Sequence, residues 1–136
     1  MALELQMLAL MTLFFMLAWL PASVSKYQTY GLGWLLSNRS TAGLPPLPEW
    51  GQRAERAHAN LIANFPGFAV AVLLLAVTGG FDQGTRVAAA LFVSARALHM
   101  LFYIRGEVWP RVISWALGLG ATLYLLTAAV TGLVKF

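Results

Sequence analysis

The sequence predicts an all-α integral membrane protein, a four-helix bundle, and three observations lead to this fold class. Sixty per cent of the 136 residues are hydrophobic and only 10% are charged, whereas about a quarter of a typical soluble domain is charged. The mean hydropathy is +0.72. Four apolar runs have roughly the twenty residues that a helix needs to cross a hydrocarbon core about 30 Å thick.

The four runs follow one another in a single transmembrane domain that covers the whole chain. They predict helices near residues 2–24, 53–78, 86–104 and 110–134. Helices are favoured over strands because every backbone polar group must be bonded internally in lipid, and because barrel strands would alternate with a period of two. The first run has no basic residues before it and no small-residue cleavage site, so we expect it to be retained as a helix.

The connections between these helices contain recognisable boundary signals. Gly79 is expected to end the second helix, and Pro110 suits the first turn of the fourth, where its missing N–H costs little. The longest connection, residues 25–52, contains three prolines between Leu44 and Pro48, which fix the backbone and remove donors. We therefore expect an ordered cap rather than a flexible tether.

Basic residues are divided unevenly between the two sides of the predicted membrane domain. Under the positive-inside rule this places loops 25–52 and 105–111 in the cytoplasm and both termini on the opposite side. The pI is about 10.0, but the cations are scattered rather than gathered in a run, so we expect no nucleic-acid partner. The cytoplasmic set is Lys26, Arg39, Arg53, Arg56, Arg105 and Arg111, and the other set is Arg86 and Lys135.

Polar side chains inside the predicted helices need an explanation, because an arginine at the centre of a membrane helix costs roughly 2.5–3.5 kcal/mol. They form two stripes, each on one helical face. We expect the stripes to meet each other, or to meet across a subunit interface, and to line a pocket open to the cytoplasm, with Arg111 at the same level. The stripes are Arg53, Arg56, Asn60 and Asn64 on the second helix and Phe92, Arg96, His99 and Tyr103 on the third.

Other interpretations of these residues stay open. Arg53, Arg105 and Arg111 can mark the cytoplasmic interface by snorkelling, and His99 can be a satisfied core histidine. A metal site is not expected, because the two histidines have no cysteine and no nearby carboxylate on their faces. There is also no Ser-His-Asp arrangement, no Gly-rich phosphate loop and no cysteine, so any thiol must come with a ligand. An anion-binding pocket remains.

Two segments resemble a known family. The segment RAERAHANLIANFP, from Arg53 to Pro66, resembles the second-helix signature of the MAPEG family, the membrane-associated proteins in eicosanoid and glutathione metabolism. The segment ARALHMLFY, from Ala95 to Tyr103, is similar to that family's third-helix motif, and Arg111 follows it. The likeness extends over nearly the whole chain. It implies a bacterial-type, microsomal glutathione transferase-like homotrimer in the inner membrane, with glutathione held between neighbouring subunits near the cytoplasmic face.

The resemblance also implies residue roles and an activity. Arg111 matches the arginine that holds the glutathione thiolate, and an arginine can stabilise this charge without losing a proton. Glutathione would be the co-substrate of a transferase or peroxidase that acts on small lipophilic electrophiles or lipid hydroperoxides from the membrane. The binding positions implied by the resemblance are Arg56, Asn60, Arg96, His99 and Tyr103. We also expect Arg53 and Asn64 to bind glutathione, because they share the same face of the second helix.

One position departs from the family pattern. The family usually has a glutamate where this chain has Ala63. Without that acid the expected pocket is more cationic, which favours an anion that lacks a free amine. The alternative function is therefore a non-catalytic membrane protein that binds fatty acids or other anionic lipids in the same inter-subunit pocket, as some members of the family do. A transporter is disfavoured, because no predicted helix is broken at mid-membrane.

Overall fold

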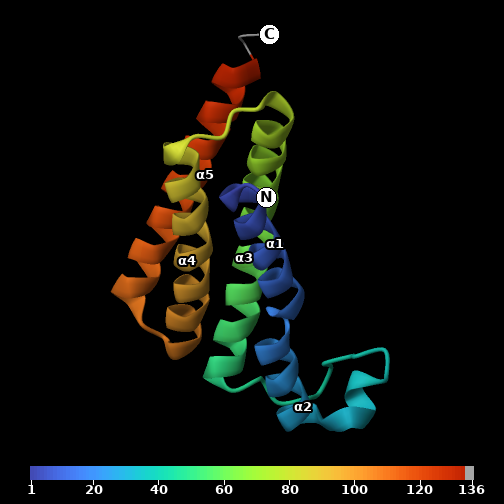
Figure 1. The fold of residues 1–136 in the computed structure, drawn as a ribbon. Helices are drawn as coiled ribbons and strands as arrows, with labels where there is room; N and C mark the ends of the chain where they lie inside the picture. Colours follow the sequence, from blue (N-terminus) through green and yellow to red (C-terminus); the bar gives the residue numbers. More distant parts are fainter. Residues whose placement is uncertain (134–136) are drawn as a thin grey trace.

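A computed structural model describes residues 1–133, and its helices run up and down in an antiparallel bundle (Figure 1). Four helical spans of the described residues are long and apolar enough to cross a membrane, because the first two helices together make one span, Leu3–Leu35. This confirms the all-α fold class and the four predicted spans. The helices are α1 (Leu3–Leu17), α2 (Leu20–Leu35), α3 (Glu49–Thr78), α4 (Gln83–Arg105) and α5 (Val108–Leu133).

The break between α1 and α2 has a local cause. Pro21 lies in the first turn of α2 and has no N–H to donate to the carbonyl four residues earlier. Ala18 instead donates to the carbonyl of Phe15, three residues back. Ala18 and Trp19 both keep right-handed helical backbone angles, so the chain continues in nearly the same direction. α1 and α2 therefore cross the membrane as one segment.

The first span is longer than the sequence predicts, and the expected loop 25–52 is shorter. The prediction ended the helix near residue 24, but the chain stays helical to Tyr30 and, after non-helical backbone angles at Gly31, forms a further helical stretch that ends at Leu35. Ser25 is buried, Lys26 forms an ion pair of 2.8 Å with Glu55 of α3, and Thr29 donates to the carbonyl of Ser25. The non-helical connection between α2 and α3 is confined to residues 36–48.

The other boundaries lie within a few residues of their expected places. α3 begins four residues earlier than expected and ends, as predicted, at Gly79, which has a left-handed φ of 65°. α4 begins directly after Asp82, whose side chain accepts from the backbone N–H of Thr85 in a capping box. Pro110 lies in the first turn of α5. The predicted end of the fourth membrane helix, residue 134, lies outside the described residues.

A small apolar core holds the bundle together. The rings of Phe68 in α3 and Phe92 in α4 stack with centroids 4.0 Å apart, and both side chains are fully buried. Met11 of α1 and Leu125 of α5 complete the cluster from the two remaining sides. Most other large apolar side chains of the spanning helices are exposed, as expected for helices that face lipid.

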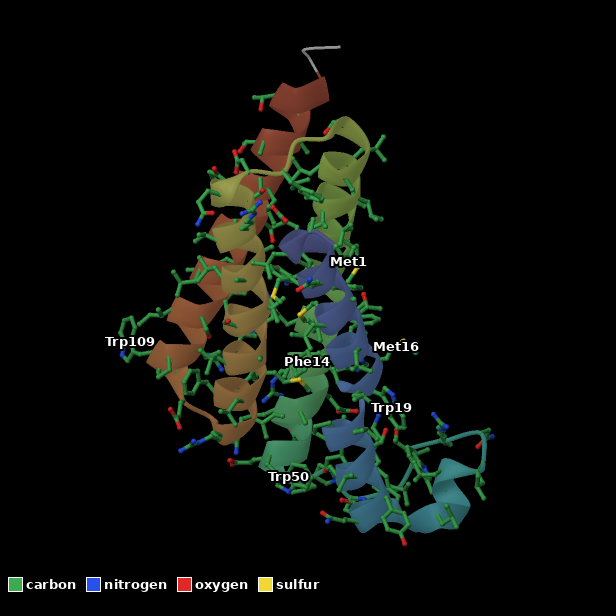
Figure 2. All side chains as sticks on the ribbon, viewed as in Figure 1. Met1, Phe14, Met16, Trp19, Trp50 and Trp109 are labelled. Carbon is green, nitrogen blue, oxygen red and sulfur yellow. The ribbon has the colours of Figure 1, made fainter. Side chains whose placement is uncertain are left out.

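The long connection between α2 and α3 and the short turn between α4 and α5 lie at the same end of the bundle (Figure 1). The connections α2–α3 and α4–α5 are at the lower end in Figure 1, and the turn between α3 and α4 is at the upper end. Figure 2 shows Trp50 near this lower end and Trp109 higher up at the side of the bundle, pointing away from it; Trp109 is 76% exposed. Exposed tryptophans are typical of the membrane interface. This arrangement agrees with a multi-pass membrane protein whose loops 25–52 and 105–111 share one side.

Candidate functional site

The candidate site is built around Arg96, which lies in the third turn from the end of α4. Its side chain is 1% exposed. One terminal nitrogen, Nη1, donates to Oδ1 of Asn60 in α3 at 3.1 Å, and the other, Nη2, donates to the carbonyl of Trp115 in α5 at 3.3 Å. The two predicted polar stripes therefore do meet, at the contact between Asn60 and Arg96. Both partners of the guanidinium are neutral.

The guanidinium of Arg96 fits against α5 because residue 118 is a glycine. A Cβ atom at Gly118 would lie 2.8 Å from both Nε and Nη2 of Arg96, which is closer than real contacts allow. On its other side the guanidinium lies 5.5 Å from the centroid of the Phe92 ring. Its Nε atom is buried and has no hydrogen-bond partner among the described residues. The pocket thus fixes a cation without satisfying all of its donors.

His99, one turn further along α4, connects this cluster to the start of α5. Its Nδ1 atom lies 2.9 Å from the carbonyl oxygen of Arg111. A carbonyl can only accept, so Nδ1 carries a proton and donates it to this bond. The Nε2 atom is buried and has no partner among the described residues. His99 therefore has the tautomer with a free lone pair on Nε2 when the ring is neutral.

Arg111 and Tyr103 form the outer part of the cluster, nearest the end of the bundle. The guanidinium of Arg111 lies 4.7 Å above the centre of the Tyr103 ring, and the ring of His99 meets Tyr103 edge-on at 5.5 Å. Arg111 and Tyr103 are both half-buried. The structure thus brings Arg96, His99, Tyr103 and Arg111 together on one side of α4, with the first two buried and the last two half-buried.

Two further predicted site residues, Asn64 and Arg53, have different partners in this subunit. Asn64 donates to the carbonyl of Asn60 at 2.7 Å and so supports the residue that accepts from Arg96. Arg53 donates from Nε to the carbonyl of Ile104 at 2.9 Å, and this bond joins the start of α3 to the end of α4. Arg53 also pairs with Glu49 on its own helix. In this subunit Arg53 thus contributes to the packing of α3 against α4.

Arg56 does not join the cluster around Arg96. It is exposed and lines a second, open pocket between α2, α3 and the loop that connects them. Within one subunit Arg56 therefore lies toward α2, while Arg53 and Asn60 of the same stripe contact α4. Ala63, the position where the family usually has a glutamate, is exposed on α3.

The charge balance of the cluster is unusual for a membrane interior. The ion pairs among the described residues are Lys26–Glu55, Arg53–Glu49 and Arg105–Glu107, so none involves Arg96 or Arg111. Two cations near each other without a carboxylate attract an anion strongly in a partly dry site. The described residues contain no group of three His, Cys, Asp or Glu side chains that could hold a metal ion. The arrangement is suited to binding an anion.

Two contributors to the site could not be recognised from residue type alone. The carbonyl of Trp115 is a backbone group, and its part in holding Arg96 follows only from the approach of α5 to α4. Gly118 has a sequence signal, since it belongs to a run of small residues in the fourth membrane helix. That signal predicts close helix packing and does not say which side chain uses the space.

Comparison with known proteins gives one match. The model of the MAPEG family matches residues 3–131, nearly the whole chain. This confirms the resemblance that the second-helix and third-helix motifs indicate. No protein with a curated description and no solved structure gives a significant match.

Proposed function

Because the chain belongs to the MAPEG family, we propose that it is a glutathione-dependent transferase or peroxidase that acts on lipophilic electrophiles or lipid hydroperoxides. One observation carries this proposal. Arg96 is buried in a membrane-spanning helix with only neutral hydrogen-bond partners, and Arg111 lies half-buried in the same cluster without an ion-pair partner among the described residues. A site with this charge is stabilised by a bound anion, and glutathione carries two carboxylates and an ionisable thiol.

The two arginines would have different roles. Arg96 and Asn60 would hold a carboxylate of glutathione, since charge-assisted bonds from arginine to carboxylate are among the strongest available. Arg111 would stabilise the thiolate. A thiol with a pKa of about 8.5 is mostly protonated at neutral pH, and an adjacent cation that does not itself lose a proton favours the ionised form. His99 and Tyr103 would complete the wall between these two positions.

The chemistry then follows from the thiolate. In a transfer reaction the sulfur forms a bond to an electrophilic carbon, and the leaving group departs with its electron pair. In a peroxidase reaction two glutathione molecules are oxidised to the disulfide while the lipid hydroperoxide is reduced to an alcohol and water. The apolar substrate would reach the site from the membrane, since large apolar side chains are exposed along the spanning helices.

A second candidate function is favoured by Ala63. The short methyl group at this position cannot hold the ammonium of glutathione, and no ion-pair partner for Arg96 or Arg111 exists among the described residues. A fatty acid has a carboxylate and no amine, so it would need only the cations. In that case the protein is a non-catalytic binder of fatty acids or other anionic lipids at the same site.

A titration of glutathione separates the two candidates. The thiolate absorbance is measured for the wild type, Arg111→Ala and Ala63→Glu, with Arg105→Ala as a charge-matched control, because Arg105 pairs with Glu107 outside the cluster. We expect a thiolate near neutral pH in the wild type, its loss in Arg111→Ala alone, and glutathione binding at least as tight in Ala63→Glu. Binding by Ala63→Glu but not by the wild type would favour the lipid-binding candidate. If neither binds, glutathione chemistry is wrong for this protein.

The proposed site also requires an assembly. Arg56 and Asn64 lie on a spanning helix with surface that this subunit leaves uncovered, and polar groups on membrane helices are usually covered by protein or water. We propose a homotrimer in which a neighbouring subunit covers this part of α3 and completes the glutathione pocket, as the family resemblance implies. Native mass measurement in mild detergent tests this: a stable monomer or dimer would exclude the inter-subunit pocket.

A further inference from the structure

The lower end of α2 has an unusual turn, away from the cluster around Arg96. Gly31 has a φ of 81° and a ψ of 172°, a combination that residues with a Cβ atom rarely adopt. Figure 1 shows that the chain beyond this point projects sideways from the bundle before it returns to α3. We call this segment, residues 31–48, the hook. Gly31 thus turns the last helical stretch of α2 out of the line of the membrane span.

The hook has an apolar outer face. Leu36 is 79% exposed and Leu32 is 58% exposed. The two leucines are four residues apart in a helical stretch, so their side chains lie on the same side of it. Neither of them lines the open pocket between the hook and α3, to which the hook contributes Trp34, Arg39, Thr41, Pro46 and Leu47. The outer face is therefore separate from that pocket.

This apolar face extends the exposed face of the first membrane span. Large apolar side chains are exposed along α1 and α2 at intervals of seven, four and three residues, which keeps them on one helical face. Leu32 and Leu36 continue this series beyond Gly31. An exposed apolar face on a membrane-spanning helix is a lipid-facing surface. The series in the span is Leu13, Leu20, Val24 and Tyr27.

The polar groups beside the two leucines are already bonded inside the hook. The Tyr30 hydroxyl donates to the carbonyl of Pro45, and Trp34 Nε1 donates to the carbonyl of Ser40, both at 2.8 Å. The backbone N–H groups of residues 36 and 37 donate to carbonyls about one turn earlier in the chain. A polar group that already has its partner costs much less to remove from water than one without a partner.

The chain after Leu36 is polar. Residues 37–41 are Ser-Asn-Arg-Ser-Thr, and all five are exposed. A helical stretch with leucines on one side and polar or basic groups on the other lies in the plane of a membrane interface, with its apolar side roughly 5–10 Å into the boundary between headgroups and acyl chains. The composition of the hook on its two sides is of this kind.

We propose that the hook is an interfacial anchor, in which Leu32 and Leu36 insert into the headgroup and acyl boundary of the membrane that the bundle spans. Gly31 provides the turn that keeps them there, since a straight α2 would carry both leucines out of the membrane and into water. The partner is lipid because the hook extends the exposed apolar face of a membrane-spanning segment (Figure 1). This inference goes beyond the proposed glutathione function and does not depend on it.

The test measures the depth of the hook in a bilayer. The chain has no cysteine, so a single introduced cysteine carries a nitroxide spin label at a known position. Leu36→Cys is labelled in nanodiscs of phosphatidylglycerol and phosphatidylcholine, with Asn38→Cys as the polar comparison. Collisions with oxygen report the acyl region, and collisions with a soluble nickel chelate report water. We expect the label at position 36 to lie roughly 5–10 Å into the boundary and the label at position 38 to collide mainly with the chelate.

A matched pair of glycine variants tests the part played by the turn. A Cβ atom would meet nothing within 4 Å at either Gly31 or Gly33, but only Gly31 has a positive φ. Alanine is therefore strained at position 31 and not at position 33. We expect Gly31→Ala to move the label at position 36 into water and Gly33→Ala to leave its depth unchanged.

Three results would overturn the proposal. If the label at position 36 meets the chelate as often as the label at position 38, the hook lies in water. If neither oxygen nor the chelate reaches it, protein covers the apolar face, and the partner is a second copy of the chain rather than lipid. An unchanged depth in Gly31→Ala would show that the glycine turn does not place the leucines. If Gly31→Ala does not fold, the depth of the Leu36→Cys label alone still decides between membrane and water, because this side chain is exposed and its replacement removes no packing.

Discussion

The first and last parts of α4 both contain a buried ionisable contact, and the two contacts are of opposite kinds. At the start, Glu4 of α1 is 0% exposed and accepts from the hydroxyl of Thr85 at 2.6 Å. Near the end, Arg96 is 1% exposed and donates to an amide and a backbone carbonyl. Each group is expensive to bury in a membrane protein. The two groups differ in where they lie relative to the ends of α4.

The buried acid is explained by the start of the helix. Thr85 belongs to the capping box of α4, in which its hydroxyl accepts from the backbone of Asp82, and Glu4 lies beside the positive end of the helix dipole. The carboxylate therefore joins α1 to the first turn of α4. Oε2 of Glu4 and Nε of Arg96 both lack a hydrogen-bond partner among the described residues, so the difference is the helix terminus: Arg96 lies inside its helix, away from either end. The comparison teaches that Glu4 has a structural role and that Arg96 is available for a ligand.

The largest expected effect comes from Arg96→Leu. We expect the affinity for glutathione or for a fatty acid to fall at least about tenfold, since a charged hydrogen bond contributes roughly 1.5–3 kcal/mol. The folded assembly should persist, because replacing a buried charge by an apolar side chain is often neutral or stabilising. Isothermal titration and a thermal melt in detergent measure the two quantities. Arg96→Lys keeps the charge but loses the planar guanidinium, so its affinity should lie between those of the wild type and Arg96→Leu.

Unchanged affinity for both ligands in a folded Arg96→Leu variant would assign Arg96 to packing alone. The comparison with Glu4 would then no longer hold, because both buried groups would be structural.

The second effect is on stability. Glu4→Ala should lower the free energy of unfolding by about 1.5–3 kcal/mol, because it removes a buried bond to a charged acceptor and leaves the Thr85 hydroxyl with only the carbonyl of Asp82. The anion affinity at the other end of α4 should not change. Unfolding by denaturing detergent measures the stability, and Gln6→Ala is the control, since Gln6 is exposed on the same helix and bonds only to the Met1 carbonyl. A loss of anion affinity in Glu4→Ala would show that the two ends are coupled.

The sequence predicted the spans because hydropathy and length decide them, but it placed the end of the first one wrongly. Residues 25–30 are polar enough to suggest a loop, but Lys26 has a partner on α3 and the helix continues to Gly31, where the backbone angles become non-helical. Lys26 is the example: its ion pair is with Glu55, which is far away in the printed sequence. Helical periodicity describes one helix at a time, so it does not predict a contact between two helices.

Part of the candidate site could be predicted from helical spacing. The face of α4 was correct, since Arg96, His99 and Tyr103 share one side by helical spacing, and the contact with Asn60 follows from two stripes that both need burial. The place of Arg56 beside α2 and the following loop could not be predicted from its stripe, because it depends on where that loop lies. The binding roles of all these residues stay predictions.

The smallest expected effect sharpens the comparison most, because it changes the space around Arg96 and leaves its charge intact. Gly118→Ala adds a Cβ atom that would lie 2.8 Å from Nε and Nη2 of Arg96, so the guanidinium must shift and weaken its bond to Asn60 or to the Trp115 carbonyl. We expect the anion affinity to fall about fivefold, near 1 kcal/mol for one weakened bond. The matched control is Gly120→Ala on the same helix, where a Cβ atom meets nothing within 4 Å. Both changes raise helix propensity equally, so equal affinities in the two variants would show that the position of the Arg96 guanidinium does not matter for binding.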